Sequence, residues 1–456
     1  MYVPDPTKPL IGEVPTRARF TLAAWLAGSA AIAYLCRQCL AVAEKTIRLD
    51  LGLTEEQMGL VFGLFFWSYA FAQIPGARLG ERYGSRCCLP AFAAVWSVAT
   101  AACAFATGFG LLVTGRIASG VAQAGLFPCA ADTISRWHST TERALVSGVL
   151  AAAMQAGAII AAPLTVMLLD VMSWRVVFAL FSIPGLCWAA GFYWWFRDRI
   201  EDHPAANVAE VALVRQGRLA ADEQAGHAGE PVPWLQLAVS RSMWMICGQQ
   251  FFRAAAYVWF ASWFATYLQE TRSVSREASG WLTSIPLLTS MFGSLVSGGL
   301  SDWVLVRTGN RGLARKGVAF FSLIICSVLV FGAYFISDPK LATISIGAGA
   351  FFAACAGTSA YATTIDMGGR HVASVFAVMN MSGNFGAALL ATVVPWFRAA
   401  LDDSPELLEM FGGNSWNAVL VLFGVMYVLA AGCWLLLRAE GSVFVEGFRN
   451  EEFAND

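Results

Sequence analysis

Three arginines lie inside apolar runs that otherwise carry almost no charge. Arg37 stands in AIAYLCRQCLAVA (residues 31–43), Arg116 in the run 110–134 and Arg253 in the run 242–268. A guanidinium within a membrane-spanning helix costs at least about 2.5–3.5 kcal/mol, so these side chains must face an interior cavity or a charged partner. The planar donor fork of arginine fits a carboxylate or a phosphate. The pattern therefore predicts a binding site for a small organic anion.

The acidic residues that could neutralise these arginines lie toward the ends of the runs. Glu44 follows Arg37 by two turns, Asp132 is near the inner end of the fourth run, and Asp366 is at the end of the tenth. We therefore expect an electropositive site that a mobile anion completes. The alternative, in which each arginine caps helix-end carbonyls or reaches the membrane interface, stays open from sequence alone.

Polar side chains at helical spacing near the arginines are candidates for binding the rest of the substrate. Several hydroxyl and amide groups favour a hydroxylated substrate such as a sugar acid. Each of them could instead form a hydrogen bond between helices. Besides the three arginines, the predicted substrate-binding residues are Tyr34, Tyr69, Gln123, Gln155, Tyr257, Asn380 and Asn384.

The elements that must position these residues are predicted to be membrane-spanning helices. The chain has 57% hydrophobic and 13% charged residues and a mean hydropathy of +0.58, values outside the range of soluble proteins. Its apolar runs are long enough to cross a hydrocarbon core, which takes about 20 helical residues, and none alternates as a barrel strand does. The sequence predicts an all-α polytopic protein with twelve transmembrane helices, near residues 20–43, 57–79, 88–108, 110–134, 144–169, 174–196, 242–268, 279–303, 316–337, 341–365, 371–397 and 415–437.

A long polar connection divides these runs into two blocks of six. The blocks repeat short motifs, such as SWRVVF at 173–178 and SWNAVL at 415–420. A parallel repeat of six-helix halves is typical of transporters that bind substrate near the midplane between the halves. We predict two pseudo-symmetric six-helix bundles, at residues 19–196 and 242–438, joined by a central loop at 197–241. A tail precedes them at 1–18 and another follows them at 439–456.

Charge and motif content limit the location and the class of the protein. Lys and Arg gather on the segments that would share a side with the amino terminus, which predicts that both termini are cytoplasmic in a cell membrane. A net charge of −1 gives no sign of a nucleic-acid partner. We find no HExxH or GxSxG motif and no metal-ligand spacing among the four histidines, so we expect no enzyme activity and no cofactor. The expected partners are the substrate anion and the lipid bilayer, and a monomer is expected.

The stretch QIPGARLGERYGSR (73–86) resembles the signature loop of the major facilitator superfamily, with Glu81 where an Asp is usual. A second copy, SGGLSDWVLVRTGNRGLARK, follows at 297–316. The wider stretches FFWSYAFAQIPGARLGERYG, GRIASGVAQAGLFPCAADTISRW and SWRVVFALFSIPGLCWAAGFYWWFRDRIEDHP resemble the anion:cation symporter family over residues 18 to 440. That family includes bacterial hexuronate, glucarate, galactonate and phthalate carriers and the animal sialin and vesicular glutamate transporters. The predicted gate residues are Gly76, Glu81, Arg82, Gly84, Arg86 and Asp302.

The resemblance implies roles for the arginines and also shows two departures. Arg37 and Arg116 match the substrate arginines of the first and fourth helices, and Arg253 matches an arginine of the vesicular glutamate branch. However, Cys36 stands where bacterial members usually have Asp, and Gln123 stands where most members have Glu. Both acids are implicated in proton movement in that family.

The expected function is therefore a secondary transporter that moves a small organic anion, such as a hexuronate, aldonate or aldarate, by alternating access with proton symport. The proton would be the coupling ion, and Glu44, Asp132 and Asp366 are the remaining candidates for carrying it. The alternatives are an exchanger or an uncoupled facilitator for organic or phosphorylated anions, or a transporter-like anion sensor.

Overall fold

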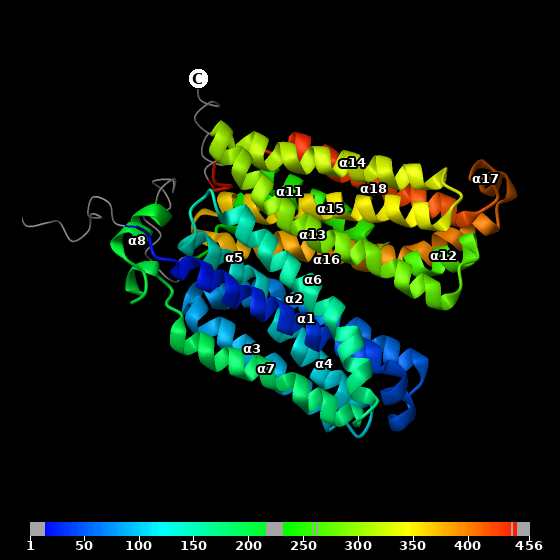
Figure 1. Ribbon diagram of the computed structural model, residues 1–456, viewed down its shortest axis with the longest axis horizontal. Coiled ribbons are helices and arrows are strands. Elements are labelled where there is room, and N and C mark those ends of the chain that lie inside the picture. Colours follow the sequence, from blue (N-terminus) through cyan, green and yellow to red (C-terminus); the bar gives the residue numbers. More distant parts are fainter. Residues whose placement is uncertain (1–13, 216–230, 259, 261–262, 439–440, 445–456) are drawn as a thin grey trace, which may run out of the picture. The chain divides into compact units, whose positions relative to one another are not determined.

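The computed structural model describes residues 14–215, 231–258, 260, 263–438 and 441–444. Parts of the predicted tails (1–13, 439–440 and 445–456) and of the predicted central loop (216–230) lie outside the described residues. Within the described ranges the regular structure is helical and contains no strand (Figure 1), so the predicted all-α class is confirmed. The chain forms two compact units, the first of residues 1–233 with 365–378 and the second of residues 234–364 with 379–456.

The first unit is a bundle of long helices that run alongside one another (Figure 1). The most extensive packing in this unit is between α1 and α6, α3 and α7, and α2 and α4. Glycines allow two of these approaches: a Cβ on Gly157 of α6 would collide with the backbone of Ala31 in α1, and a Cβ on Gly120 of α4 would collide with the backbone of Phe65 in α2. The helices are α1 (Ala18–Leu51), α2 (Glu55–Tyr83), α3 (Ser85–Ala104), α4 (Phe109–Ala124), α5 (Leu126–Trp137), α6 (Arg143–Leu169), α7 (Trp174–Trp195), the short 3₁₀ helix η1 (Ile200–Asp202) and α8 (Val208–Arg215).

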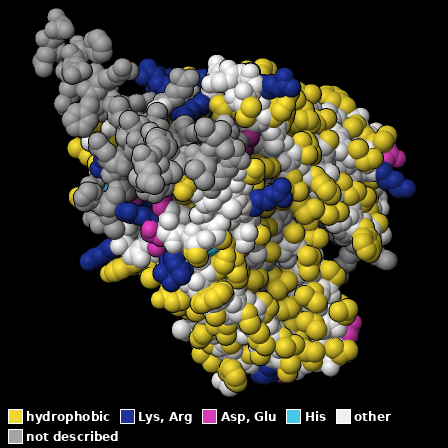
Figure 2. Space-filling view, turned by 60° about the vertical axis from the view of Figure 1, so that its left-hand side comes forward, with side chains coloured by type: hydrophobic (Ala, Val, Ile, Leu, Met, Phe, Trp, Pro, Cys, Tyr) yellow, Lys and Arg dark blue, Asp and Glu magenta, His cyan; other side chains and the backbone are white. Residues whose placement is uncertain are grey.

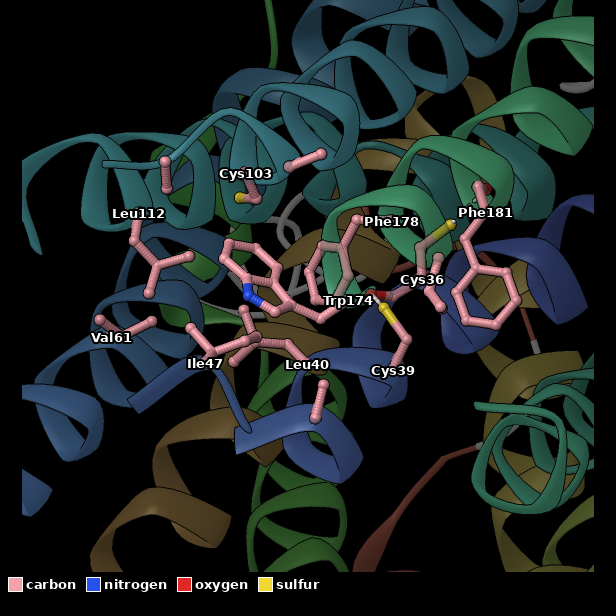
Figure 3. Packing of buried hydrophobic residues seen from close by; sticks show 14 of the residues in the cluster. Cys36, Cys39, Leu40, Ile47, Val61, Cys103, Leu112, Trp174, Phe178 and Phe181 are labelled. Atoms are coloured by element: carbon pink, nitrogen blue, oxygen red, sulfur yellow. Dashed lines mark hydrogen bonds between the residues drawn. The ribbon is translucent and has the colours of Figure 1, made fainter. Parts of the chain in front are cut away.

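A hydrophobic core fills the space between α1, α2, α3, α4 and α7. Cys36, Cys39 and Leu40 on one face of α1 lie near Trp174 and Phe178 of α7 (Figure 3). Cys36, Cys39 and Leu40 share this face because residues three or four apart lie on the same side of a helix. The residue after Cys36 is about 100° farther around the helix. The core thereby directs Arg37 to a different face of α1 from Cys36.

The predicted fourth span is built from two helices rather than one. α4 ends at Ala124 and α5 begins at Leu126. Pro128 lies in the first turn of α5, and its ring would clash with the carbonyl of Ala124, four residues earlier, in an uninterrupted helix. The break puts Gln123 in the last turn of α4.

The second unit is also helical. α14 and α11 both pack on α18, and Gly293 of α13 approaches the backbone of Phe351 in α15 so closely that a Cβ there would collide with it. The elements are α10 (Trp234–Val239), α11 (Arg241–Val258), α12 (Phe264–Arg272), α13 (Arg276–Thr308), the π-helical turn η3 (Gly312–Gly317), α14 (Val318–Tyr334), α15 (Pro339–Met367), the 3₁₀ turn η4 (Gly369–His371), α16 (Val372–Asp402), α17 (Pro405–Met410) and α18 (Ser415–Leu436).

The helix surfaces suit a lipid environment. Nine helices among the described residues are long and apolar enough to cross a membrane. Large apolar side chains face outward, for example Trp194, Trp281 and Trp396, each more than three-quarters exposed, and hydrophobic side chains cover much of the face in Figure 2. Such extended apolar surface is typical of a membrane or protein contact and not of a soluble monomer. Each predicted run overlaps described helix, the fourth α4 and α5 and the seventh α11 and α12. Residues 259, 261 and 262 of the seventh run lie outside the described residues.

Residues 365–378 belong to the first unit although they follow the central loop by more than a hundred positions. Asp366 accepts a 2.8 Å ion-paired hydrogen bond from Arg143 of α6, and both side chains are buried. Ala373 and Ala377 of α16 pack against Ala77 of α2. The compact unit is therefore defined by these contacts and not by the central loop alone.

The first part of the predicted central loop folds against the start of α1. Glu210 of α8 is fully buried and accepts hydrogen bonds from the guanidinium of Arg19 at 2.9 Å and from its backbone N–H at 3.1 Å. A carboxylate at a helix N-terminus also interacts favourably with the helix dipole. Arg19 pairs in addition with Glu142 at 3.1 Å. Residues 208–215 are therefore a docked helix within the polar connection.

His138 follows α5 and is fully buried beside this cluster. Its Nε2–H donates to the carbonyl of Arg19 at 3.0 Å, while its Nδ1 has no partner among the described residues. Burial lowers the pKa of His138 to about 3, and the charges of Arg19 and Arg143 lower it further in the same direction. The imidazole is therefore neutral in the folded protein at ordinary pH.

This pKa predicts an acid-sensitive contribution to stability. An unfolded histidine has a pKa of about 6.5, so below that pH the unfolded state binds a proton that the folded state does not, and folding loses up to about 1.4 kcal/mol per pH unit until the pH approaches 3. Gln can keep the hydrogen bond to Arg19 without titrating. We expect His138→Gln to reduce the fall in thermal unfolding midpoint of the detergent-solubilised protein between pH 6.5 and 4.5. An identical fall in the variant and the original protein would contradict this.

Candidate functional site

Arg37 projects from α1 into a group of aromatic rings. Its guanidinium carbon lies 4.4 Å from the ring centroid of Tyr34, 4.7 Å from that of Phe65 and 4.9 Å from that of Tyr69. One of its terminal nitrogens donates a 3.1 Å hydrogen bond to the side-chain oxygen of Gln123. Its Nε is buried without a partner among the described residues. The rings attract the cation through their π faces, but they do not neutralise its charge.

Arg116 projects from α4 toward the ring of Phe65, which Arg37 also contacts. Its guanidinium carbon is 4.4 Å from the centroid of Phe65, and the residue is only 5% exposed. Glycines before and after it bring α4 close to its neighbours: a Cβ on Gly115 would meet the carbonyl of Ala99 in α3 at 3.2 Å, and one on Gly120 would meet the N–H of Tyr69 in α2 at 3.2 Å. α4 is thereby held near enough to α2 for Arg116 to reach Phe65.

No carboxylate pairs with Arg116 within the described residues. Four arginines there are buried, and the other three each bind an acid: Arg19 binds Glu142 and Glu210, Arg143 binds Asp366, and Arg315 binds Asp302. Burying a charge costs several kcal/mol unless a partner compensates it. Arg116 is therefore the exception among the four buried arginines.

Arg37 and Arg116 form a shared cationic site, hereafter the arginine pair site, together with Phe65, Gln123 and Tyr34. Because both guanidinium carbons are within 4.7 Å of one ring centroid, the two charges are close neighbours. Two like charges in a low-dielectric surrounding repel each other. The site can be relieved by an anion, whose oxygens would accept charge-assisted hydrogen bonds from both donor forks.

Gln123 and Cys36, which stand where members of the resembled family usually have acids, have different surroundings. Gln123 is buried and lies in the arginine pair site, where its amide oxygen accepts the bond from Arg37 but its amide group cannot take up a proton. Cys36 faces the core instead, and its thiol donates to the carbonyl of Phe181 at 3.3 Å. Neither residue supplies a negative charge to the arginines.

The second unit contains an analogous arginine. Arg253 of α11 donates a 3.0 Å hydrogen bond to the side-chain oxygen of Gln250, and its Nε is buried without a described partner. No described carboxylate pairs with it. A Cβ on Gly357 of α15 would lie 2.9 Å from its terminal nitrogen, so glycine at 357 leaves room for the guanidinium. Arg253 therefore resembles Arg37: each bonds a glutamine amide oxygen, and neither pairs with a described acid.

The remaining predicted binding residues have the following surroundings. In the second unit, Asn384 donates to the carbonyl of Asn380 one turn earlier at 2.8 Å, and Tyr257 packs edge-on against Phe260. Gln155 of α6 is 9% exposed. Tyr34 belongs to the arginine pair site, and the ring of Tyr69 lies beside it, 4.9 Å from the guanidinium carbon of Arg37. These residues remain predictions as substrate ligands.

The predicted proton carriers are each bound to an arginine. Glu44 pairs with Arg48 at 2.7 Å and Asp132 with Arg136 at 2.9 Å, both one helical turn apart. The third, Asp366, pairs with Arg143 as described above. Each of the three carboxylates is thus already bound to a cation of the chain. None of the three contacts Arg37 or Arg116.

The predicted gate residues lie toward the ends of α2 and α13, between α2 and α3, and at the start of α3. Glu81 accepts from Arg78 at 2.7 Å and from the backbone N–H and the hydroxyl of Ser374 at 2.8 and 2.9 Å. In the second unit Asp302 pairs with Arg315 at 2.7 Å. Both acids therefore pair with an arginine, but the partner is three residues before Glu81 and thirteen residues after Asp302.

The glycines and arginines of the signature loop have structural partners. Gly76 lies against Gly125, where a Cβ would approach its Cα to 2.8 Å. Gly84 has a φ of +80° and lies against the carboxylate of Asp198, which also accepts from the N–H of Arg86 at 3.1 Å. Arg82 is exposed and lies over the ring of Tyr83 at 5.3 Å. A side chain at position 84 would be strained and would collide.

The sequence analysis missed Phe65, the ring that both arginines share, and the glycines Gly120 and Gly357. Phe65 belongs to a run rich in aromatic residues, and nothing in its type or spacing distinguishes it from a lipid-facing phenylalanine. The spacing of Gly120 one turn after Arg116 was a usable signal, since small residues mark close helix contacts in membranes.

The arginine pair site leads to a stability prediction. Arg116→Met removes an uncompensated buried charge but keeps much of the side-chain volume, so the ligand-free variant should unfold at the same temperature as the original protein or higher. Arg315→Met is the matched control, because Arg315 is equally buried but paired, and breaking a buried pair costs about 3–5 kcal/mol. Thermal unfolding in detergent compares them. A destabilised Arg116→Met protein, similar to Arg315→Met, would contradict an unpaired charge at 116.

Comparison with known proteins places this arrangement in context. The family model described as Major Facilitator Superfamily matches residues 26–391 and 246–453. The probable sulfoacetate transporter of Cupriavidus necator is 28% identical over 383 residues, covering 84% of this chain and 87% of the relative. The D-galactonate transporter of Escherichia coli is 28% identical, covering 93% and 98%, and the hexuronate transporter of Bacillus subtilis is 30% identical, covering 80% and 85%.

Solved structures share the fold at low sequence identity. The fucose:proton symporter of E. coli superposes with a TM-score of 0.69 at 14% identity, covering 92% of this chain and 99% of that one. A proton:xylose symporter superposes with a TM-score of 0.67 at 14% identity, covering 91% and 94%. The predicted twelve-helix architecture is confirmed by these matches.

Proposed function

The chain belongs to the Major Facilitator Superfamily, and from this premise we propose that it carries a small organic anion of the sugar-acid class across the cytoplasmic membrane by alternating access. It is a multi-pass membrane transport protein and not an enzyme. The observation that carries the proposal is the arginine pair site, in which Arg37 and Arg116 share the ring of Phe65 without a carboxylate among the described residues.

The sugar-acid class is supported by two further observations. Relatives that align with most of the chain are named as transporters of D-galactonate and of hexuronate. The site also holds groups that can bind substrate hydroxyls, because Gln123 has an amide N–H₂ and both Tyr34 and Tyr69 carry phenol groups near Arg37. An acid group on the arginines and hydroxyls on these neighbours would satisfy both parts of such a molecule.

The orientation and assembly are also proposals. The distribution of Lys and Arg between loops favours cytoplasmic termini. The docked α8, which holds the start of α1 through Glu210 and Arg19, would then lie on the cytoplasmic side. We propose a monomer as the transporting unit.

Proton symport is the coupling that we propose, and anion exchange is a second candidate that one observation favours. Glu44, Asp132 and Asp366 are each ion-paired with an arginine, and Gln123 cannot titrate. Symport would therefore require one of these pairs to open during the cycle so that its carboxylate can bind a proton. Exchange needs no such step, because the returning carrier would hold a second anion on the same arginines.

A transport assay with arginine variants tests the proposed function. Purified protein is placed in liposomes loaded with unlabelled galactonate, glucarate or galacturonate, and by counterflow it should accumulate the labelled form of at least one of the three compounds. Arg37→Ala and Arg116→Ala each remove a charge-assisted contact worth about 2–5 kcal/mol, so affinity should fall by at least about 30-fold. Arg215→Ala, in the exposed pair with Glu201, is the control and should transport normally.

Two results would contradict the proposal in different ways. Normal counterflow by Arg37→Ala and Arg116→Ala would exclude the arginine pair site as the binding site. Anion binding without flux, measured as a raised unfolding temperature in protein that does not exchange label, would indicate a sensor and not a transporter.

A separate experiment decides the coupling. Uptake into liposomes that are empty of anion, with an inward proton gradient, should exceed uptake without the gradient, and a protonophore should abolish the difference. Asp366→Asn should remove this stimulation if Asp366 carries the proton, whereas Asp302→Asn, in the other buried pair, should not. Uptake that requires internal anion and ignores the gradient would contradict symport and establish exchange.

A further inference from the structure

The charge of the arginine pair site constrains the substrate more narrowly than the proposed function does. We propose that the transported compound is a dianion, with two acid groups or one doubly charged group, and that a compound with a single negative charge binds poorly. The inference rests on the proposed function, because it assumes that substrate binds at Arg37 and Arg116. It follows from three properties of the first unit.

The first property is the proximity of the two cations. Arg37 and Arg116 approach one Phe65 ring at 4.7 and 4.4 Å, so their separation cannot exceed the sum of these distances. A compact molecule can therefore contact both guanidinium groups at once. Each group retains free donors: Arg37 uses one nitrogen on Gln123, and Arg116 makes no hydrogen bond within the described residues.

The second property is the scarcity of acids around the site. α3, α4, α6 and α7 contain no Asp or Glu at all. The acids of α1 and α5 are each paired with an arginine, as is Glu81 of α2 with Arg78. The side chains of Glu55 and Glu56, at the start of α2, lie outside the described residues. The ion pairs are Glu44 with Arg48, Asp50 with Arg175, and Asp132 with Arg136. The charge of the arginine pair site is therefore two positive units that the described acids do not cancel.

The third property is the identity of the group that bonds Arg37. A carboxylate at position 123 would cancel one of the two charges, whereas the amide of Gln123 orients Arg37 and cancels none. A bound monoanion would leave one positive charge uncompensated in the buried site. A dianion would neutralise both, and uncompensated buried charge is the largest electrostatic cost available here.

A matched pair of compounds tests the proposal. Glucarate and gluconate share a six-carbon hydroxylated skeleton and differ in whether carbon six is a second carboxylate. Binding is measured on the full chain in detergent by calorimetry and by the rise in unfolding temperature. We expect glucarate to bind at least about tenfold more tightly than gluconate. Sulfoacetate and glucose 6-phosphate distinguish a sulfonate or a phosphate as the source of the second charge, and glucose measures binding without charge.

Two variants at one position separate charge from shape. Gln123→Glu places a carboxylate beside Arg37 and lowers the site charge by one, so the ratio of glucarate to gluconate affinity should fall at least about tenfold. Gln123→Leu removes the same hydrogen bond without changing the charge. In that control both affinities should fall together, and the ratio should stay within about threefold of the original.

The outcomes separate this inference from the proposed function. Equal affinity for gluconate and glucarate, with both lost in Arg116→Met, would leave the transport proposal intact and overturn the dianion. An unchanged ratio in Gln123→Glu would also overturn it. If none of the anions binds, both proposals fail.

Discussion

An unpaired positive charge in the interior of a membrane bundle is the constraint on which the account depends. The described chain shows how it compensates buried arginines elsewhere, since Arg19, Arg143 and Arg315 all contact acids within 3.1 Å. Arg116 is as well buried and has no such partner. A folded protein tolerates that cost when the charge serves a ligand, and a transporter in particular must leave its binding site incomplete so that the substrate completes it.

The surroundings of the arginine pair site explain how the chain holds two like charges close together. Phe65 offers a π surface to both cations, which lowers the cost of their burial without cancelling their charge. Gly120 allows α4 to approach α2, and the interruption before Pro128 ends α4 at the turn that carries Gln123. Packing of Cys36 in the core directs Arg37 toward this group. The site is thus assembled by small residues and a helix break as much as by the arginines themselves.

Much of the fold could be predicted because hydropathy is a local property. Runs of apolar residues determined the helices, and the charge of Arg37 and Arg116 was enough to identify them as candidates. Contacts between distant residues could not be predicted in this way. The pairing of Arg143 with Asp366 joins positions 223 residues apart, and Glu210 reaches Arg19 across 191 residues. Phe65 was missed because a phenylalanine in an apolar run has no distinctive local signal. Asp366 was predicted as a proton carrier from its residue type, and the sequence could not show that Arg143 binds it.

We infer that a substrate anion is the partner that Arg37 and Arg116 lack among the described residues. The most direct test is an experimental structure of the protein with glucarate bound. We expect acid oxygens about 2.7–3.2 Å from the guanidinium nitrogens of both arginines, with Gln123 still bonded to Arg37. Substrate bound away from both arginines, or either guanidinium paired with a carboxylate of the chain, would contradict it.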